Sequence, residues 1–117
     1  MICVDLDTNK VIKKILFPSS VGLPTTYLNN VRFDLSRDSE VLALITDSSQ
    51  SGPNGIIVVD LKTDESWRQI SNHPSTKAED IKNFRPILEG KSFVIVQNDG
   101  PLNHCANMGI DRMTISS

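Results

Sequence analysis

Apolar and polar residues alternate in short runs along most of the chain, and turn-forming residues separate the runs. Residues 2–6 and 11–17 flank one such turn cluster, a pattern that predicts a β-hairpin. Residues 31–35 place apolar side chains on one face and polar ones on the other, which predicts a half-buried strand. Residues 41–45 have no polar face, so we expect a strand that is covered on both sides.

The remaining runs continue the strand pattern. Residues 56–61 predict a second buried strand, and residues 67–71 a shorter outer one. Residues 92–97 predict a further strand, and alternation resumes at residues 109–116. We expect the core to be built from eight side chains of these strands: Val31, Phe33, Leu35, Leu42, Leu44, Ile57, Val59 and Trp67.

A helix is predicted at one place. Thr76 and Glu79 have the spacing of a capping box, in which a hydroxyl and a carboxylate satisfy the first amides of a helix. Pro86 should end this helix, because the residue before a proline disfavours helical geometry. The sequence therefore predicts a short helix of at most two turns from Thr76 to Phe84.

The motif Val-Asp-Leu-x-Thr occurs twice, and its aspartates, Asp5 and Asp60, lie 55 residues apart. About four short strands fit into this interval, which is typical of a β-propeller blade. In such a blade the innermost strand faces a central channel, and its neighbours are packed between adjacent sheets. The alternative is an antiparallel sandwich in which two similar turns coincide by chance.

Length and charge limit the class of protein. The 117 residues are enough for one domain, and the net charge of −2 gives no basic surface for nucleic acid. No apolar run approaches the ~20 residues of a membrane span, and the N-terminus shows no secretion signal. Cys3 and Cys105 belong to no Cys-x-x-Cys pair, so a structural zinc site is not expected, and whether they form a disulfide is left open.

Several motifs, in the same order as in the family pattern, resemble the major royal jelly protein and yellow family. They are Leu-Pro-Thr-Thr-Tyr-Leu-Asn-Asn-Val-Arg-Phe-Asp, Thr-Asp-Ser, Val-Asp-Leu-x-Thr-x-x-Ser-Trp-Arg and His-Pro-Ser. Two positions depart from the family pattern: Asn30 stands where the family has aspartate, and Arg112 where it has glycine. The resemblance implies a six-bladed β-propeller of antiparallel four-stranded blades, of which this chain would supply about two, as a fragment.

This resemblance implies a division of the chain. Residues 1–28 would end one blade, and residues 29–74 would form a full blade. Residues 75–108 would be a connecting insertion with the short helix and a strand, and residues 109–117 would begin the next blade.

Nucleophilic catalysis finds no support, because the chain has no Gly-x-Ser-x-Gly motif and its two histidines have no fixed relation to a nucleophile. We therefore predict no catalytic residue. Asn29, Asn30 and Asp47 flank predicted strands and are candidate ligand-binding residues. Asp111 is a candidate metal ligand, since oxygen donors of this kind suit Ca²⁺. The alternative for all four is that they shape turns by bonding to their own backbone.

The favoured interpretation is a secreted, non-enzymatic propeller segment that binds a small molecule, since family members are typically secreted and some bind small amines. One alternative is a metal-dependent lactone hydrolase of gluconolactonase type, which would use Asn29 and Asp111. Another is a protein-interaction module. We expect no nucleic-acid or membrane partner, no cofactor unless Ca²⁺ binds, and self-association through exposed β edges.

Overall fold

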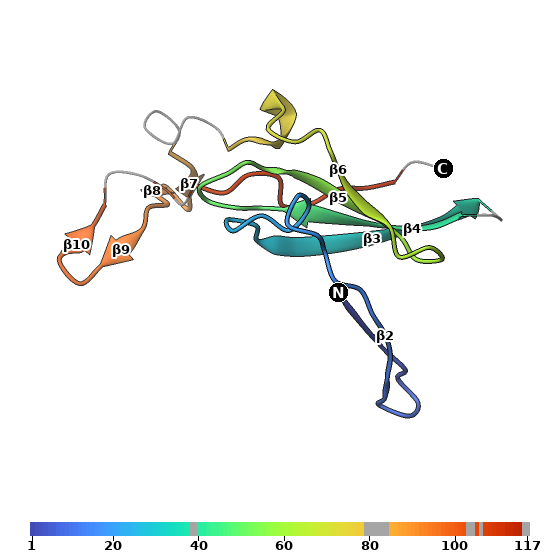
Figure 1. Ribbon diagram of the computed structural model, residues 1–117. Helices are drawn as coiled ribbons and strands as arrows, with labels where there is room; N and C mark the ends of the chain where they lie inside the picture. Colours follow the sequence, from blue (N-terminus) through green and yellow to red (C-terminus); the bar gives the residue numbers. More distant parts are fainter. Residues whose placement is uncertain (38–39, 79–84, 103–104, 106, 116–117) are drawn as a thin grey trace.

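The computed structural model describes residues 1–37, 40–78, 85–102, 105 and 107–115. Within these residues the chain consists of antiparallel β-strands and one 3-10 turn, which confirms the predicted all-β class. One sheet has four strands, and short two-stranded hairpins project from the chain on either side of it (Figure 1). This arrangement is consistent with part of a propeller, whose number of blades remains a prediction.

The four-stranded sheet is a meander in which each strand pairs with the next along the chain. Its strands are β3 (Leu28–Arg37), β4 (Glu40–Asp47), β5 (Gly55–Asp60) and β6 (Ser66–Gln69). Their alternating and fully apolar runs are those in which the sequence predicted strands. This sheet is the element that positions the candidate site.

An N-terminal hairpin, formed by β1 (Ile2–Val4) and β2 (Val11–Lys14), confirms the first sequence prediction. Its turn repeats the turn between β5 and β6. Asp5 Oδ1 accepts hydrogen bonds from the amides two and three residues ahead, at 2.8 and 2.9 Å, and Asp60 Oδ1 does the same at 2.8 and 3.3 Å. Each aspartate amide also donates to the carbonyl five residues ahead, at 2.9 Å. The sequence repeat is therefore a structural repeat.

These backbone donors change the titration of both aspartates. The Thr8 amide beside Asp5, and the Lys62 amide beside Asp60, hold the pKa of each carboxyl below its ordinary value. A lowered pKa stabilises the fold at pH values above the titration of the unfolded carboxyl, and this contribution is lost as the pH falls through the folded pKa. Both turns are therefore expected to lose stability at low pH.

The core lies on one face of the four-stranded sheet, beneath the segment that follows β2. Ala43 and Ile45 of β4 are directly opposite Val59 and Ile57 of β5, so the four side chains share a face. Burying an aliphatic side chain of this kind contributes about 1.5–3 kcal/mol. The core cluster contains six buried side chains: Ile15, Val21, Ala43, Ile45, Ile57 and Val59.

Several predicted core residues are not buried, and this is a correction. Val31, Phe33 and Leu35 of β3 are 38%, 53% and 69% exposed, and Trp67 of β6 is 37% exposed. The strands that carry them, β3 and β6, are the two ends of the sheet. The segment that covers the core lies over the middle strands, so the apolar face of β3 extends beyond it.

The remaining predicted core residues are fully or partly buried. Ile57 and Val59 are fully buried, which confirms the prediction for β5. Leu42 and Leu44 point to the opposite face of β4 and are half-buried. The strand predicted to be covered on both sides is thus covered fully on one face and partly on the other.

The predicted helix lies mostly on residues 79–84, which are outside the described residues. At its predicted start the chain instead forms a 3-10 turn, η1 (Pro74–Thr76), so Thr76 ends a turn and does not open a helix. His73 caps this turn, because its ring nitrogen accepts a hydrogen bond from the Ser75 amide at 3.2 Å. The Thr76 hydroxyl donates back to the His73 carbonyl at 2.8 Å.

The strand predicted at residues 92–97 is divided in two. Its ends belong to separate two-stranded sheets, β7 (Ile87–Leu88) with β8 (Lys91–Ser92), and β9 (Val96–Gln97) with β10 (Gly100–Pro101). Tight turns reverse the chain on both sides of this segment, so each half pairs with its own neighbour. The apolar pattern correctly predicted strand residues at both ends of this segment, but the prediction of one continuous strand was wrong.

Residues 107–115 form no regular strand, although alternation predicted one. They run across the end of the four-stranded sheet and bond to its loops. The Ile110 amide donates to the Thr76 carbonyl at 2.9 Å, and the Ser48 hydroxyl donates to the Ile110 carbonyl at 2.5 Å. In the described residues no helix is long and apolar enough to span a membrane.

Candidate functional site

All four residues singled out from the sequence lie at one end of the four-stranded sheet. Leu28 of β3 pairs with Asp47 of β4, which pairs with Gly55 of β5, so the start of β3 and the end of β4 meet there. Asp111 reaches the same place from the C-terminal segment, because its backbone carbonyl accepts a hydrogen bond from Thr46 at 3.1 Å. We call this region the loop end of the sheet.

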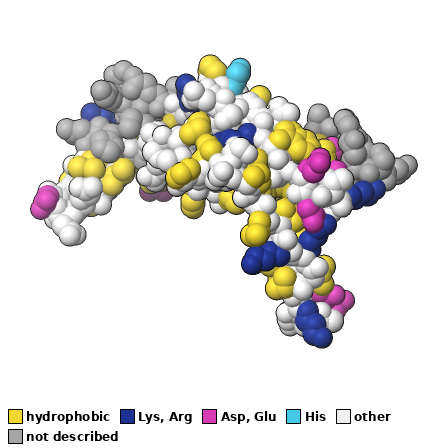
Figure 2. Space-filling view, viewed as in Figure 1, with side chains coloured by type: hydrophobic (Ala, Val, Ile, Leu, Met, Phe, Trp, Pro, Cys, Tyr) yellow, Lys and Arg dark blue, Asp and Glu magenta, His cyan; other side chains and the backbone are white. Residues whose placement is uncertain are grey.

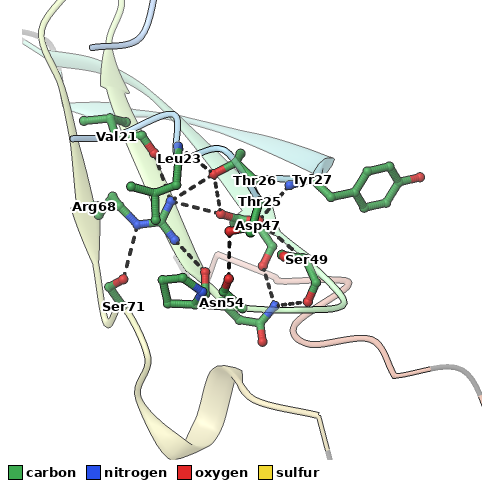
Figure 3. A network of polar contacts seen from close by, with 12 residues as sticks. Val21, Leu23, Thr25, Thr26, Tyr27, Asp47, Ser49, Asn54, Arg68 and Ser71 are labelled. Carbon is green, nitrogen blue, oxygen red and sulfur yellow. Dashed lines mark hydrogen bonds and ion pairs between the residues drawn. The ribbon is translucent and has the colours of Figure 1, made fainter. Parts of the chain in front are cut away.

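Asp47 has a structural role at the loop end. Its side chain is fully buried and forms an ion pair with Arg68 at 2.9 Å, shown in Figure 3. Its two oxygens also accept hydrogen bonds from the Thr26 hydroxyl and the Tyr27 amide, both at 2.9 Å, and from the Ser49 amide at 3.2 Å. With its acceptors used in this way, Asp47 stabilises the loop end of the sheet, and its assignment as a ligand-binding residue stays a prediction.

Arg68 joins the loops around this carboxylate. Its guanidinium donates to the carbonyls of Val21 at 2.9 Å and Pro53 at 3.0 Å, and to the Ser71 hydroxyl at 3.2 Å. Every one of these bonds uses the planar fork of the arginine side chain, which a lysine could not reproduce. A single buried cation therefore connects the segments before β3, after β4 and after β6.

Gly55 gives Arg68 the space to reach Asp47. The two charged residues lie on β4 and β6, with β5 between them, and Gly55 occupies the position opposite Asp47. A Cβ atom at Gly55 would lie 3.4 Å from the Arg68 guanidinium and 3.1 Å from the Gln69 carbonyl oxygen. The absence of a side chain on β5 thus allows an ion pair across a strand.

Sequence reasoning overlooked Arg68, although the strand period contained the signal. Ala43, Ile45 and Asp47 share one face of β4 because side chains two residues apart point the same way. The buried face of a fully apolar strand therefore continues into an acidic residue. Because a buried carboxylate requires a partner of opposite charge, the position of Asp47 on the buried face indicated a buried cation on a neighbouring strand.

Asn29 and Asp111 form the accessible part of the site. The Asn29 amide group donates to the Asp111 carboxylate, and both side chains are exposed. Asn30 is held by a hydrogen bond from its own amide to the Thr46 hydroxyl at 2.9 Å. Its side-chain oxygen is buried and, among the described residues, has no hydrogen-bond partner. The structure thus brings Asn29 and Asp111 into contact and leaves the Asn30 side-chain oxygen without a partner among the described residues.

An apolar pocket of about 410 Å³ adjoins this pair. It lies between β1 and β3, and Asn29 is its one polar side chain apart from the Cys3 thiol. Small-molecule sites are typically concave and apolar with a few polar groups that fix orientation. The pocket is lined by Met1, Ile2, Cys3, Val4, Leu28, Asn29, Val31, Phe33 and Ile45.

The donors at this end of the sheet do not by themselves fit Ca²⁺. Calcium takes six to eight oxygen ligands, usually with several carboxylates. Asp111 supplies one carboxylate, and Asn29 and Asn30 supply amides. No group of three or more His, Cys, Asp or Glu side chains that could hold a metal occurs among the described residues. Cys3 and Cys105, both described, form no disulfide.

A close approach of the C-terminal segment fixes the geometry of the loop end. Gly109 lies against the amide group of Asn54, and a Cβ atom at Gly109 would overlap it. Asn54 is buried and cannot easily move, because its amide donates to the carbonyls of Asp47 at 3.2 Å and Ser49 at 2.7 Å. Only a glycine allows residues 107–111 to pack this closely.

Replacing Gly109 with alanine is expected to lower the free energy of unfolding by about 1–3 kcal/mol, because the new methyl group must displace Asn54. Urea denaturation measures this loss. In an Asn54→Ala background the same substitution should cost much less, since the overlapping group is gone. Equal losses in the two backgrounds would show that the two residues are not in contact.

The fold and the site together indicate a class of protein. A four-stranded antiparallel meander, whose outer turn recurs 55 residues earlier in the chain, is consistent with part of a β-propeller. The family model of the major royal jelly protein matches residues 1–97, and the chain belongs to this family. No curated protein matches the chain.

Proposed function

We propose that the chain binds a small molecule without catalysing a reaction, as part of an extracellular protein. The observation that carries this proposal is the apolar pocket lined by Asn29, whose side chain also contacts the Asp111 carboxylate. The pocket walls suit an apolar body, and the carboxylate suits a group that donates hydrogen bonds. The ligand class is therefore a small, mainly apolar molecule with one amino or hydroxyl group.

Electrostatics at this place favour a positively charged group. Asp111 is half exposed, and Arg112 approaches it no closer than 3.8 Å, so the arginine neutralises the carboxylate weakly. Asp47, the other carboxylate at the loop end, is already neutralised by Arg68. A ligand amine at Asp111 would thus meet a carboxylate that has no cation closer than Arg112 within the described part of the chain.

The described polar groups support binding more than catalysis. The His73 ring contacts the Ser75 hydroxyl at 2.8 Å, which resembles a nucleophile and its base. The same ring nitrogen, however, caps the amide of Ser75 within a single exposed turn. A catalytic pair needs a third group that orients the base, and none of the hydrogen bonds of His73 supplies one. Secretion rests on family membership.

Benzylamine, benzyl alcohol and benzoate, titrated against the full chain by NMR, test this proposal. We expect benzylamine to bind best and Asp111→Asn to weaken its binding about tenfold, because a charge-assisted hydrogen bond is lost. The matched control is Asp99→Asn, which removes an exposed carboxylate outside the site. Asn29→Ala should weaken all three ligands by disturbing the pocket.

Two results would contradict the proposal. The first is equal binding of benzylamine and benzoate, unaffected by Asp111→Asn, which would mean that the carboxylate does not face the ligand. The second is calcium-dependent hydrolysis of a simple lactone that Asp111→Ala abolishes. That result would establish the hydrolase alternative.

A further inference from the structure

We infer that the loop end holds a second binding site, which takes a neutral polyhydroxyl compound of monosaccharide size. The site is a pocket of about 330 Å³ between the loops before β3 and after β4, closed on one side by the C-terminal segment. This inference does not depend on the first pocket, because the two pockets share no lining residue. The second pocket is lined by Thr25, Tyr27, Ser49, Gln50, Ser51 and Met108.

Ser49 supplies an unused hydrogen-bonding group. The residue is 2% exposed, and its hydroxyl oxygen is buried without a hydrogen-bond partner among the described residues. Its backbone is fixed at both ends, since the amide donates to Asp47 at 3.2 Å and the carbonyl accepts from Asn54 at 2.7 Å. A buried hydroxyl without a partner is unfavourable, so a guest that bonds to it gains affinity.

Tyr27 supplies a flat apolar surface. Its backbone is locked, because the amide donates to Asp47 and the carbonyl accepts from the Ser48 amide, both at 2.9 Å. The residue is 55% exposed, and its ring points away from the Asp47–Arg68 network, as Figure 3 shows. A ring held in this way can stack on the C–H face of a sugar at little entropic cost.

The remaining lining determines the class of ligand. None of the six lining side chains is charged, so among the residues that the structure describes neither an anion nor a cation would find a counter-charge in the pocket. Thr25 gives its proton to the Gly52 carbonyl at 2.7 Å and keeps its lone pairs as acceptors. Gln50 and Ser51 add an amide and a hydroxyl. Such a lining favours the binding of a neutral ligand that has several hydroxyl groups.

The experiment is a titration of the full chain with methyl glucoside, followed by ligand-observed NMR. We expect saturable binding that Tyr27→Ala reduces at least tenfold and Tyr27→Phe retains, because the ring face makes the contact. Ser49→Ala should weaken binding about fivefold, as the loss of one hydrogen bond implies. Asn29→Ala, in the first pocket, should leave sugar binding unchanged.

Three results would overturn the inference. One is the absence of saturable binding to the wild-type chain, and a second is sugar binding that Tyr27→Ala and Ser49→Ala leave unchanged. The third is equal or tighter binding of benzyl alcohol, which would make the pocket a site for aromatic molecules. Far-ultraviolet circular dichroism of each variant confirms that a loss of binding is not a loss of fold.

Discussion

Replacing Arg68 with methionine is expected to lower the free energy of unfolding by about 3–5 kcal/mol, because it leaves the Asp47 carboxylate buried without its cation. Both side chains are almost completely removed from solvent, and their oxygen and nitrogen atoms lie 2.9 Å apart. The substitution also frees the carbonyls of Val21 and Pro53. Urea denaturation, monitored by the fluorescence of Trp67, measures the loss.

The exposed ion pair between Lys13 and Asp64 provides the control. Its atoms are even closer, at 2.6 Å, yet the two side chains remain 31% and 50% exposed. Because solvent screens such a pair, Lys13→Met should cost at most about 1 kcal/mol. A comparable loss for Lys13→Met and Arg68→Met would show that burial does not determine the strength of the Asp47 pair.

A double substitution separates the charge from the packing. Removing both partners, as Asp47→Ala with Arg68→Met, should cost less than the sum of the two single losses, since no unpaired charge remains. Additive losses would mean that each residue acts through its own hydrogen bonds and that the ion pair contributes little. Either outcome identifies which part of the network stabilises the loop end.

The strand period predicted the sheet but not the surface that covers it. Alternation placed Phe33 on one apolar face with Val31 and Leu35, and the register aligns that face with the buried residues of β4, since Phe33 lies opposite Ala43. Whether Phe33 is buried depends on what packs above β3, and the pattern of one strand contains no such information. The 53% exposure of Phe33 is therefore determined by tertiary packing and not by the sequence of β3 alone.

The candidate site was predicted only in part, because its contacts also depend on tertiary structure. Asn29 and Asp111 were chosen as residues at strand ends, and their contact spans 82 positions of the chain, a distance that local patterning cannot bridge. Asp47 was also chosen as a strand-end residue, but its parity with Ala43 and Ile45 places it inside the sheet. The positions of the strand ends thus predicted where polar side chains gather. The alternation of side chains along β4 would have predicted that Asp47 is the buried one.

We propose that the isolated chain self-associates by pairing two copies of β3. This strand is ten residues long and forms one edge of the sheet, with no strand on its outer side in the described part of the chain. Long edge strands with apolar faces are templates for pairing with another chain. The net charge of −2 gives little repulsion between copies.

The sequence of β3 favours one register. In an antiparallel pair centred on Phe33, Arg32 of each copy lies opposite Asp34 of the other, and Val31 lies opposite Leu35. Opposite charges directly across two strands stabilise the pair, and like charges destabilise it. The exposed apolar side chains of the two copies would form one continuous face. Charge and apolar pattern therefore agree on a symmetric dimer.

Sedimentation velocity at micromolar concentration tests this register through a charge exchange. Arg32→Asp alone should shift the chain toward monomer, because it places two acidic side chains opposite each other twice in the dimer, and Asp34→Arg alone should do the same. The double variant restores opposite charges and should restore the dimer. Lys91→Asp, which changes the charge as Arg32→Asp does but at an exposed site outside β3, should leave association unchanged. A wild-type chain that stays monomeric, or a double variant that does not recover, would mean that the edge of β3 is not the surface of association.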